Sequence, residues 1–180
     1  MSKKLYGYAG KILRVNLSDG KIWAEDTGKY ADFLGGRGFL AKIAWDELKP
    51  GTDPFSPENK LIVMTGPLTG ILSPGSGRTA IGGIAPQVYP KPWFTRSNIG
   101  GKFGSELKYC GFDGIVIEGA SEKPVYLWIH DEREVEILDA ADLWGLDTFI
   151  VQKELKRKHG DCLLYTSPSP RDLSTSRMPS

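Results

Sequence analysis

Glycine and proline are concentrated between residues 66 and 104, and no other feature of the 180-residue sequence restricts the fold as much. Proline has no amide hydrogen to donate inside a helix, and glycine costs about 1 kcal/mol relative to alanine there. A long helix is therefore excluded from this stretch. We predict short strands joined by tight loops instead.

Short strands and helices are predicted on both sides of this stretch. Apolar residues on either side of the turn sequence SDG at 18–20 predict a β-hairpin over residues 11–25. Apolar residues at helical spacing over 30–48, interrupted by glycines at 35–38, predict two joined helices. Further strands are expected at 60–65, 114–118, 124–130 and 134–138, and further helices at 100–109, with Asn98 as its candidate cap, and at 148–159. This order fits an α+β fold with largely antiparallel sheets and a few helices.

Charge and cysteine content exclude several classes of protein. The 23 basic and 22 acidic side chains are mixed along the chain, so a nucleic-acid partner is not expected. Apolar runs are far shorter than the ~20 residues that a membrane helix needs, and we recognise no signal peptide. We therefore expect a cytoplasmic protein without a membrane partner.

The two cysteines, Cys110 and Cys162, form no Cys-x-x-Cys pair. This spacing argues against a disulfide scaffold, a zinc site or a complete iron–sulfur site. We interpret Cys110 as a small core residue.

The last part of the sequence differs in composition from the rest. Residues 162–180 are rich in Ser, Pro and Arg and have too few apolar residues to form a core. We predict that this segment is disordered, and it resembles translated adapter or vector read-through. The folded domain is then expected to span residues 1–161. A genuine flexible tail is the alternative.

Two glycine-rich loops are candidate anion sites. Residues 73–79 (SPGSGRT) combine glycines with the guanidinium of Arg78, and residues 98–102 (NIGGK) place amides and a lysine before a predicted helix. Glycine lets backbone amides converge on a phosphate because no side chain is in the way. The alternative interpretation is that these glycines only allow tight turns.

Known nucleotide-binding motifs do not fit these loops. Gly-x-Gly-x-x-Ala patterns occur at 36–41 and 75–80, but neither lies between a strand and a helix as a dinucleotide site requires. Phe103 stands where a P-loop needs Ser or Thr. The sequence therefore disfavours both a Rossmann site and a P-loop.

Several segments in a fixed order resemble one known family. They are residues 10–18 (GKILRVNLS), 35–38 (GGRG), 55–62 (FSPENKLI), 66–70 (GPLTG) with Gly77 and Arg78 after it, 98–109 (NIGGKFGSELKY) and 111–119 (GFDGIVIEG). Together they are similar to the N-terminal domain of tungsten-containing aldehyde ferredoxin oxidoreductases. The resemblance covers about residues 5–160.

The resemblance implies where a cofactor is bound. It implies two similar halves whose sheets form the base for a tungsten bis-pyranopterin, a cofactor of the molybdopterin type. Arg78 is implied to hydrogen-bond between the pterin and a 4Fe–4S cluster, which suits a planar fork of donors. Asn98 and Gly100 are implied to hold the pterin phosphates, and we add Gly77 and Gly101 of the same loops to the predicted site. The backbone carbonyl of Asn98 is also the implied ligand of a bridging Mg²⁺, a metal that prefers hard oxygen ligands.

The activity implied by the resemblance is the oxidation of aldehydes to carboxylic acids at tungsten, with electrons passing through the cluster to ferredoxin. A small aldehyde and ferredoxin are therefore the expected partners, and a homo-oligomer is a further expectation. Two cysteines cannot hold the cluster, so we expect the 180-residue chain alone to be inactive. The alternatives are a subunit of a same-family reductase of aromatic-ring thioesters and a stand-alone module that binds a phosphate-bearing ligand.

Overall fold

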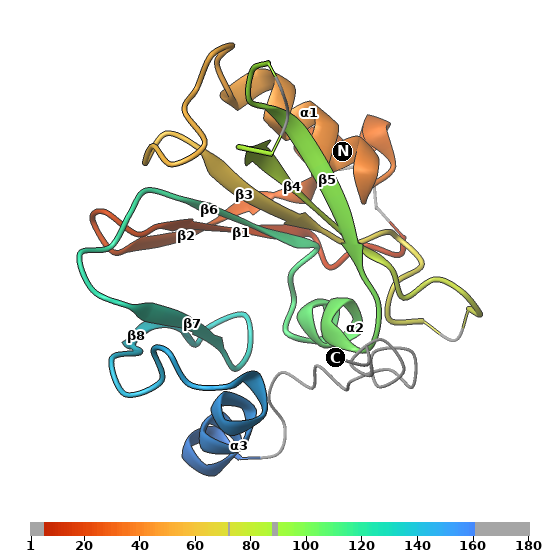
Figure 1. Ribbon diagram of the computed structural model, residues 1–180. Coiled ribbons are helices and arrows are strands. Elements are labelled where there is room, and N and C mark those ends of the chain that lie inside the picture. The colour runs from red at the N-terminus through yellow and green to blue at the C-terminus, as the bar shows by residue number, and fades with distance from the viewer. Residues whose placement is uncertain (1–5, 72, 88–89, 161–180) are drawn as a thin grey trace, which may run out of the picture.

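The computed structural model describes residues 6–71, 73–87 and 90–160 (Figure 1). Over these residues the chain forms a six-stranded mixed sheet, a separate two-stranded hairpin and four helices, which confirms the α+β class. The strand order in the sheet is β2-β1-β6-β3-β4-β5. Among the described strands, only β1 and β6 pair in parallel.

The elements follow one another in a mixed order along the chain. The sheet contains β1 (Lys11–Asn16), β2 (Lys21–Asp26), β3 (Lys60–Met64), β4 (Thr79–Ala85), β5 (Trp93–Ile99) and β6 (Gly114–Glu118). The hairpin contains β7 (Val125–Ile129) and β8 (Val135–Asp139). The helices are the 3-10 helix η1 (Thr27–Phe33) and the α-helices α1 (Arg37–Glu47), α2 (Phe103–Tyr109) and α3 (Thr148–His159).

Most predicted elements are confirmed, and one detail is wrong. The first hairpin is β1–β2, the two joined helices are η1 and α1, and the described part of 66–104 contains β4, β5 and loops before α2 begins. Asn98, however, does not cap α2. It lies in β5 opposite Ala80, because strand pairing continues to Ile99, and the residue before α2 is Lys102, which makes no side-chain cap hydrogen bond.

The two ends of the sheet are alike in part. Each end is an antiparallel pair, β2–β1 on one side and β4–β5 on the other. The inner pairings differ, because β1 joins β6 in parallel whereas β4 joins β3 antiparallel. The implied similarity of two halves therefore stays a prediction.

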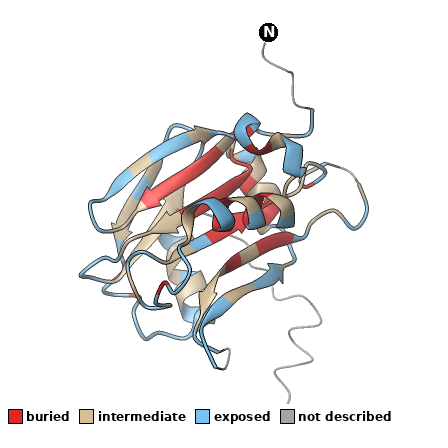
Figure 2. Cartoon of the chain, turned by 90° about the horizontal axis from the view of Figure 1, so that it is seen from above, coloured by how far each residue is buried: buried red, intermediate tan, exposed pale blue. Residues whose placement is uncertain are grey.

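Both faces of the sheet are packed. Side chains alternate along each strand, so Ile12, Ile62 and Val116 lie on one face and form a buried cluster with Phe39 and Ile43 of α1. The opposite face forms a second cluster, in which α2 and the β7–β8 hairpin pack against the sheet. Figure 1 shows α1 on one side of the sheet and α2, β7, β8 and α3 on the other. In Figure 2 the buried residues gather in the middle of the sheet and on the helix that crosses it, and the loops are mostly exposed.

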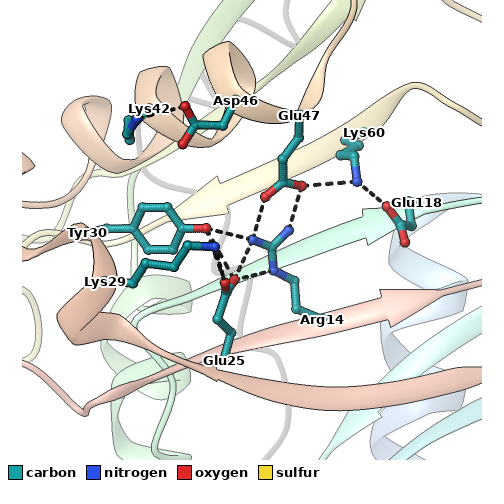
Figure 3. A network of polar contacts seen from close by, with 9 residues as sticks. All are labelled: Arg14, Glu25, Lys29, Tyr30, Lys42, Asp46, Glu47, Lys60 and Glu118. Carbon is teal, nitrogen blue, oxygen red and sulfur yellow. Dashed lines mark hydrogen bonds and ion pairs between the residues drawn. The ribbon is translucent and has the colours of Figure 1, made fainter.

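A buried ionic network joins the C-terminal end of α1 to the sheet (Figure 3). Arg14 of β1 is 6% exposed and donates to both oxygens of Glu47, the last residue of α1, at 2.8 and 2.7 Å. Arg14 also donates to Glu25 of β2, and Lys60 of β3 bridges Glu47 and Glu118. Burial alone would raise the pKa of Glu47, but hydrogen bonds from Arg14 and Lys60 hold that pKa below its ordinary value. The network therefore pairs each of its buried charges.

Two predictions concern parts that the described residues only partly cover. The predicted tail at 162–180 lies outside them, so both the tail and the domain boundary at 161 stay predictions. Within the described parts of the chain, no helix is both long and apolar enough to cross a membrane.

Candidate functional site

A pocket of about 440 Å³ opens on the face of the sheet that carries α1, at the N-terminal end of this helix. Three parts of the chain line it: residues 34–37 before and at the start of α1, residues 66–67 after β3, and the β4–β5 region, which contributes Arg78 directly before β4, Ala80 and Asn98. Two of the five predicted site residues, Arg78 and Asn98, are therefore brought together in one cavity.

The first wall is a sharp turn between η1 and α1. Leu34, Gly35 and Gly36 have positive φ angles of 63°, 117° and 49°. Two of the three are glycines, which adopt such angles without steric strain. A Cβ at Gly38 would lie 1.9 Å from the carbonyl oxygen of Phe33, so only glycine fits at that position. The Gly36 amide donates a hydrogen bond to the backbone carbonyl of Thr65 at 2.8 Å, which fixes the start of α1 against the end of β3.

The second wall depends on Asp113, a buried carboxylate that is 1% exposed. Its oxygens accept hydrogen bonds from the amides of Ala9 and Gly10, the Thr27 hydroxyl and the Lys108 ammonium group, at 2.7 to 2.9 Å. Its backbone carbonyl accepts from both the amide and the hydroxyl of Thr65, at 2.9 and 2.7 Å. Asp113 thereby holds the segment that leads into the 66–67 turn.

The third wall comes from the pairing of β4 with β5. Ala80 and Asn98 are directly opposite each other in this pair. Arg78 lies directly before β4, two residues before Ala80, and lines the same pocket as Ala80. The two glycine-rich stretches of the sequence therefore lie side by side through strand pairing.

The three predicted glycines lie beside the pocket and do not line it. A Cβ at Gly77 would lie 3.6 Å from the carbonyl oxygen of Gly101, so these two loops are adjacent. At Gly100 and Gly101 a Cβ would meet no atom within 4 Å, which leaves their backbone accessible to a ligand. Their role in binding stays a prediction.

The helix N-terminus that borders the pocket is different from the one expected. The sequence pattern suggested that α2 offers its amides to an anion, but α2 has only seven residues and begins beyond the lining residues. The structure instead places the start of α1, an 11-residue helix, at the pocket. The GGRG sequence at 35–38 is the available signal, but it predicts a joint between helices and contributes to the family resemblance without pointing to an anion site.

The pocket is positively charged. Arg37 and Arg78 both line it, and its lining includes no Asp or Glu. Within the described residues, the guanidinium group of neither arginine has a hydrogen bond or an ion pair. Guanidinium groups bind phosphate through two parallel hydrogen bonds, so this lining fits an anionic, phosphate-bearing ligand.

The side chains do not form a metal site of their own. Among the residues that the structure covers, no group of three or more His, Cys, Asp or Glu side chains could hold a metal ion. Cys110 is half-buried next to the second core cluster, with its Sγ 3.5 Å from the carbonyl oxygen of His130, and burial raises the pKa of its thiol. Its interpretation as a packing residue is in agreement with this position. A metal at the pocket would need oxygen atoms of the ligand together with backbone carbonyls.

The sequence is similar to a defined set of oxidoreductases. The family model described as "Aldehyde ferredoxin oxidoreductase, N-terminal domain" matches residues 12–169, beyond the predicted boundary at 161. The tungsten-containing aldehyde ferredoxin oxidoreductase of Pyrococcus abyssi is 47% identical over 159 residues, which are 87% of this chain and 26% of that protein. The WOR-like subunit of an aliphatic sulfonate oxidoreductase of Pyrococcus furiosus is 38% identical over 86% of this chain and 24% of its own length.

A solved structure supports the same assignment. One chain of the active-site complex BamBC of benzoyl coenzyme A reductase, determined with 1,5-dienoyl-CoA, superposes with a TM-score of 0.80 at 37% identity. The superposition covers 85% of this chain and 23% of that chain. The present chain thus spans about a quarter of the length of the relatives it matches. It belongs to the aldehyde ferredoxin oxidoreductase family and corresponds to the N-terminal domain of that family.

Proposed function

We propose that this chain is the tungstopterin-binding part of a longer oxidoreductase, and that the pocket at the start of α1 receives the phosphate-bearing end of the cofactor. The observation that carries this proposal is that Arg78, directly before β4, and Asn98 of β5 line one cavity whose lining includes no acidic residue. The tungsten-containing relatives supply the identity of the cofactor.

The residues present fit such a ligand. The open backbone at Gly100 and Gly101 lets a large group approach without steric obstruction. The guanidinium of Arg78 is permanently charged and can donate to a phosphate and to a pterin edge. The backbone carbonyl of Asn98 is the proposed protein ligand of Mg²⁺, whose other ligands would be phosphate oxygens.

The chemistry proposed for the complete enzyme belongs to the cofactor. When bound, the tungsten pterin supplies the two-electron oxidation of an aldehyde to a carboxylic acid, with a 4Fe–4S cluster passing electrons to ferredoxin. The residues of this chain bind and orient the cofactor, and the cluster cysteines are expected in other parts of the longer protein. The chain alone is therefore proposed to be inactive.

Several large apolar side chains support the idea of a longer protein. Trp45, Trp93, Trp144 and Phe55 are between 69% and 85% exposed. Contact with further domains would cover such surface.

The proposal is tested by elemental analysis of the longer protein. The DNA that follows the codon for Gly160 should continue in frame and encode clustered cysteines, and the complete protein should contain tungsten. Arg78→Gln should lower its tungsten content severalfold, whereas Arg133→Gln, an exposed arginine in the turn between β7 and β8, should leave it unchanged. A complete protein that is free of tungsten contradicts the proposal, and a stop codon soon after Gly160 favours the stand-alone module.

A second candidate substrate class comes from the structural relative. Because a chain of a benzoyl coenzyme A reductase complex has the same fold at 37% identity, reduction of an aromatic-ring thioester by the same cofactor is the alternative. Assays of the complete protein with aldehydes and with aromatic thioesters separate the two activities.

A further inference from the structure

The two ends of α1 carry charges that oppose its dipole. Arg37 is the first residue of the helix, where the amides are partially positive, and Glu47 is the last, where the carbonyls are partially negative. Each placement is unfavourable for an isolated helix. Because both end charges have the sign that the helix dipole disfavours, we look for groups of opposite charge near each end.

At the C-terminal end, the fold supplies the compensation. Glu47 accepts from Arg14 at 2.8 and 2.7 Å and from Lys60 at 3.0 Å. The two cations neutralise the carboxylate and also lie near the negative end of the helix. Nothing further is required there.

At the N-terminal end, neither the first turn of the helix nor the described lining of the pocket contains an acidic side chain. Gly36 occupies the N-cap position without a side chain to accept from the first amides, and the first turn contains no acidic residue. Arg37 shares the pocket with Arg78, so two guanidinium groups line one cavity in which no carboxylate is present. Two like charges at the positive end of a helix disfavour the free protein, unless an anion from outside the chain balances them.

We infer that Arg37 is a second anion-binding residue of the pocket and that, beside Arg78, it takes a phosphate ester group. The inference rests on the proposed function, since the group would belong to the phosphate-bearing end of the cofactor. A phosphate suits the site because it carries up to two negative charges and several acceptor oxygens, enough for two guanidinium forks. The volume of about 440 Å³ leaves room for a diphosphate or for a phosphate with its organic part.

Inorganic pyrophosphate is the probe for this subsite. Its affinity for the 180-residue chain is measured by titration calorimetry at constant ionic strength, with chloride as the balancing anion. Arg37→Gln should weaken the apparent Kd about fivefold to tenfold, as expected for the loss of one charge-assisted contact. Arg133→Gln, which removes an exposed arginine outside the pocket, should leave it unchanged.

Charge reversal at the same position separates binding from a structural role. In chloride buffer, Arg37→Glu should raise the Tm by roughly 1–4 °C, because it places an acid at the helix N-terminus next to Arg78. The same variant should lose the increase in Tm that pyrophosphate gives the unmodified chain. If Arg37 only supported the fold, the Arg37→Glu variant would have a lower Tm than the unmodified chain.

The possible results distinguish this inference from the proposed function. If Arg78→Gln weakens pyrophosphate binding and Arg37→Gln does not, the Arg37 subsite is wrong and the proposed function stands. A lower Tm of Arg37→Glu in chloride also overturns the inference, as does an unmodified chain that binds pyrophosphate no better than sulfate. In each case the tungsten content of the complete protein still tests the proposed function independently.

Discussion

The arginine of the buried network and the arginines of the pocket lie on the same face of the sheet but differ in every other respect. Arg14 is almost fully buried and donates to Glu25, Glu47 and Tyr30. Arg37 and Arg78 are exposed, and no carboxylate shares their cavity. Burying a charge is costly unless it is paired, so the pairing of Arg14 serves the folded state. The unpaired arginines have no such role in the described structure, and this difference is part of the reason why we propose the pocket as a ligand site.

The largest expected effect is on the network. Arg14→Ala leaves Glu25 and Glu47 without their shared cation inside the protein, so we expect the free energy of unfolding to fall by about 3–5 kcal/mol. Urea unfolding followed by tryptophan fluorescence measures it. Arg133→Ala is the matched control and should change the free energy by less than about 0.5 kcal/mol. If both variants lose less than about 0.5 kcal/mol of unfolding free energy, the network does not stabilise the fold, and the distinction between Arg14 and the arginines of the pocket is wrong.

A smaller effect is expected from pH. The folded-state pKa of Glu47 is below its ordinary value of 4.5, so its ionised form stabilises the fold above that pH, and this contribution is lost as the pH falls through the lowered pKa. Glu47→Gln should therefore be less stable than the unmodified chain at neutral pH. The difference between their unfolding free energies should narrow below pH 4.5. A difference that stays constant down to acid unfolding would mean that Glu47 is not held ionised by Arg14 and Lys60.

The smallest effect is expected at the pocket. Arg78→Gln should change the free energy of unfolding in phosphate-free buffer by less than about 0.5 kcal/mol, because the side chain is exposed and unpaired. The same urea titration measures it. A loss of about 2 kcal/mol or more would place Arg78 among the structural arginines, with Arg14.

Local patterns in the sequence predicted the elements, whereas the contacts between distant segments could not be predicted. Turn residues and alternating apolar side chains located β1–β2, and the glycines and prolines of 66–104 excluded a long helix. The network was missed because its members come from five separate elements, and nothing in the sequence marks Arg14 or Glu47 as partners. Asp113 has no predicted role, although an acidic residue directly before an apolar strand can mark a buried, hydrogen-bonded carboxylate.

Only part of the candidate site could be predicted, because the rest depends on contacts between distant segments. Arg78 and Asn98 were identified by resemblance, and strand pairing then brought them together. The wrong cap at Asn98 shows that a residue with a good local propensity for capping was recruited by the long-range pairing of β5 with β4. The N-terminus of α1 was not assigned to the site, because only the folded chain places residues 34–37 beside the turn at 66–67.

The position of β6 has a consequence for synthesis of the protein. This strand is inserted between β1 and β3, and Ile12 pairs with Gly114, so the centre of the sheet closes only after the chain has returned across about a hundred residues. On the ribosome, β1–β2 and β3–β4–β5 would emerge as two partial sheets, each with an open inner edge. Until residue 118 leaves the exit tunnel, the inner edges of β1 and β3 lack their partner β6, and unpaired strand edges favour association between chains.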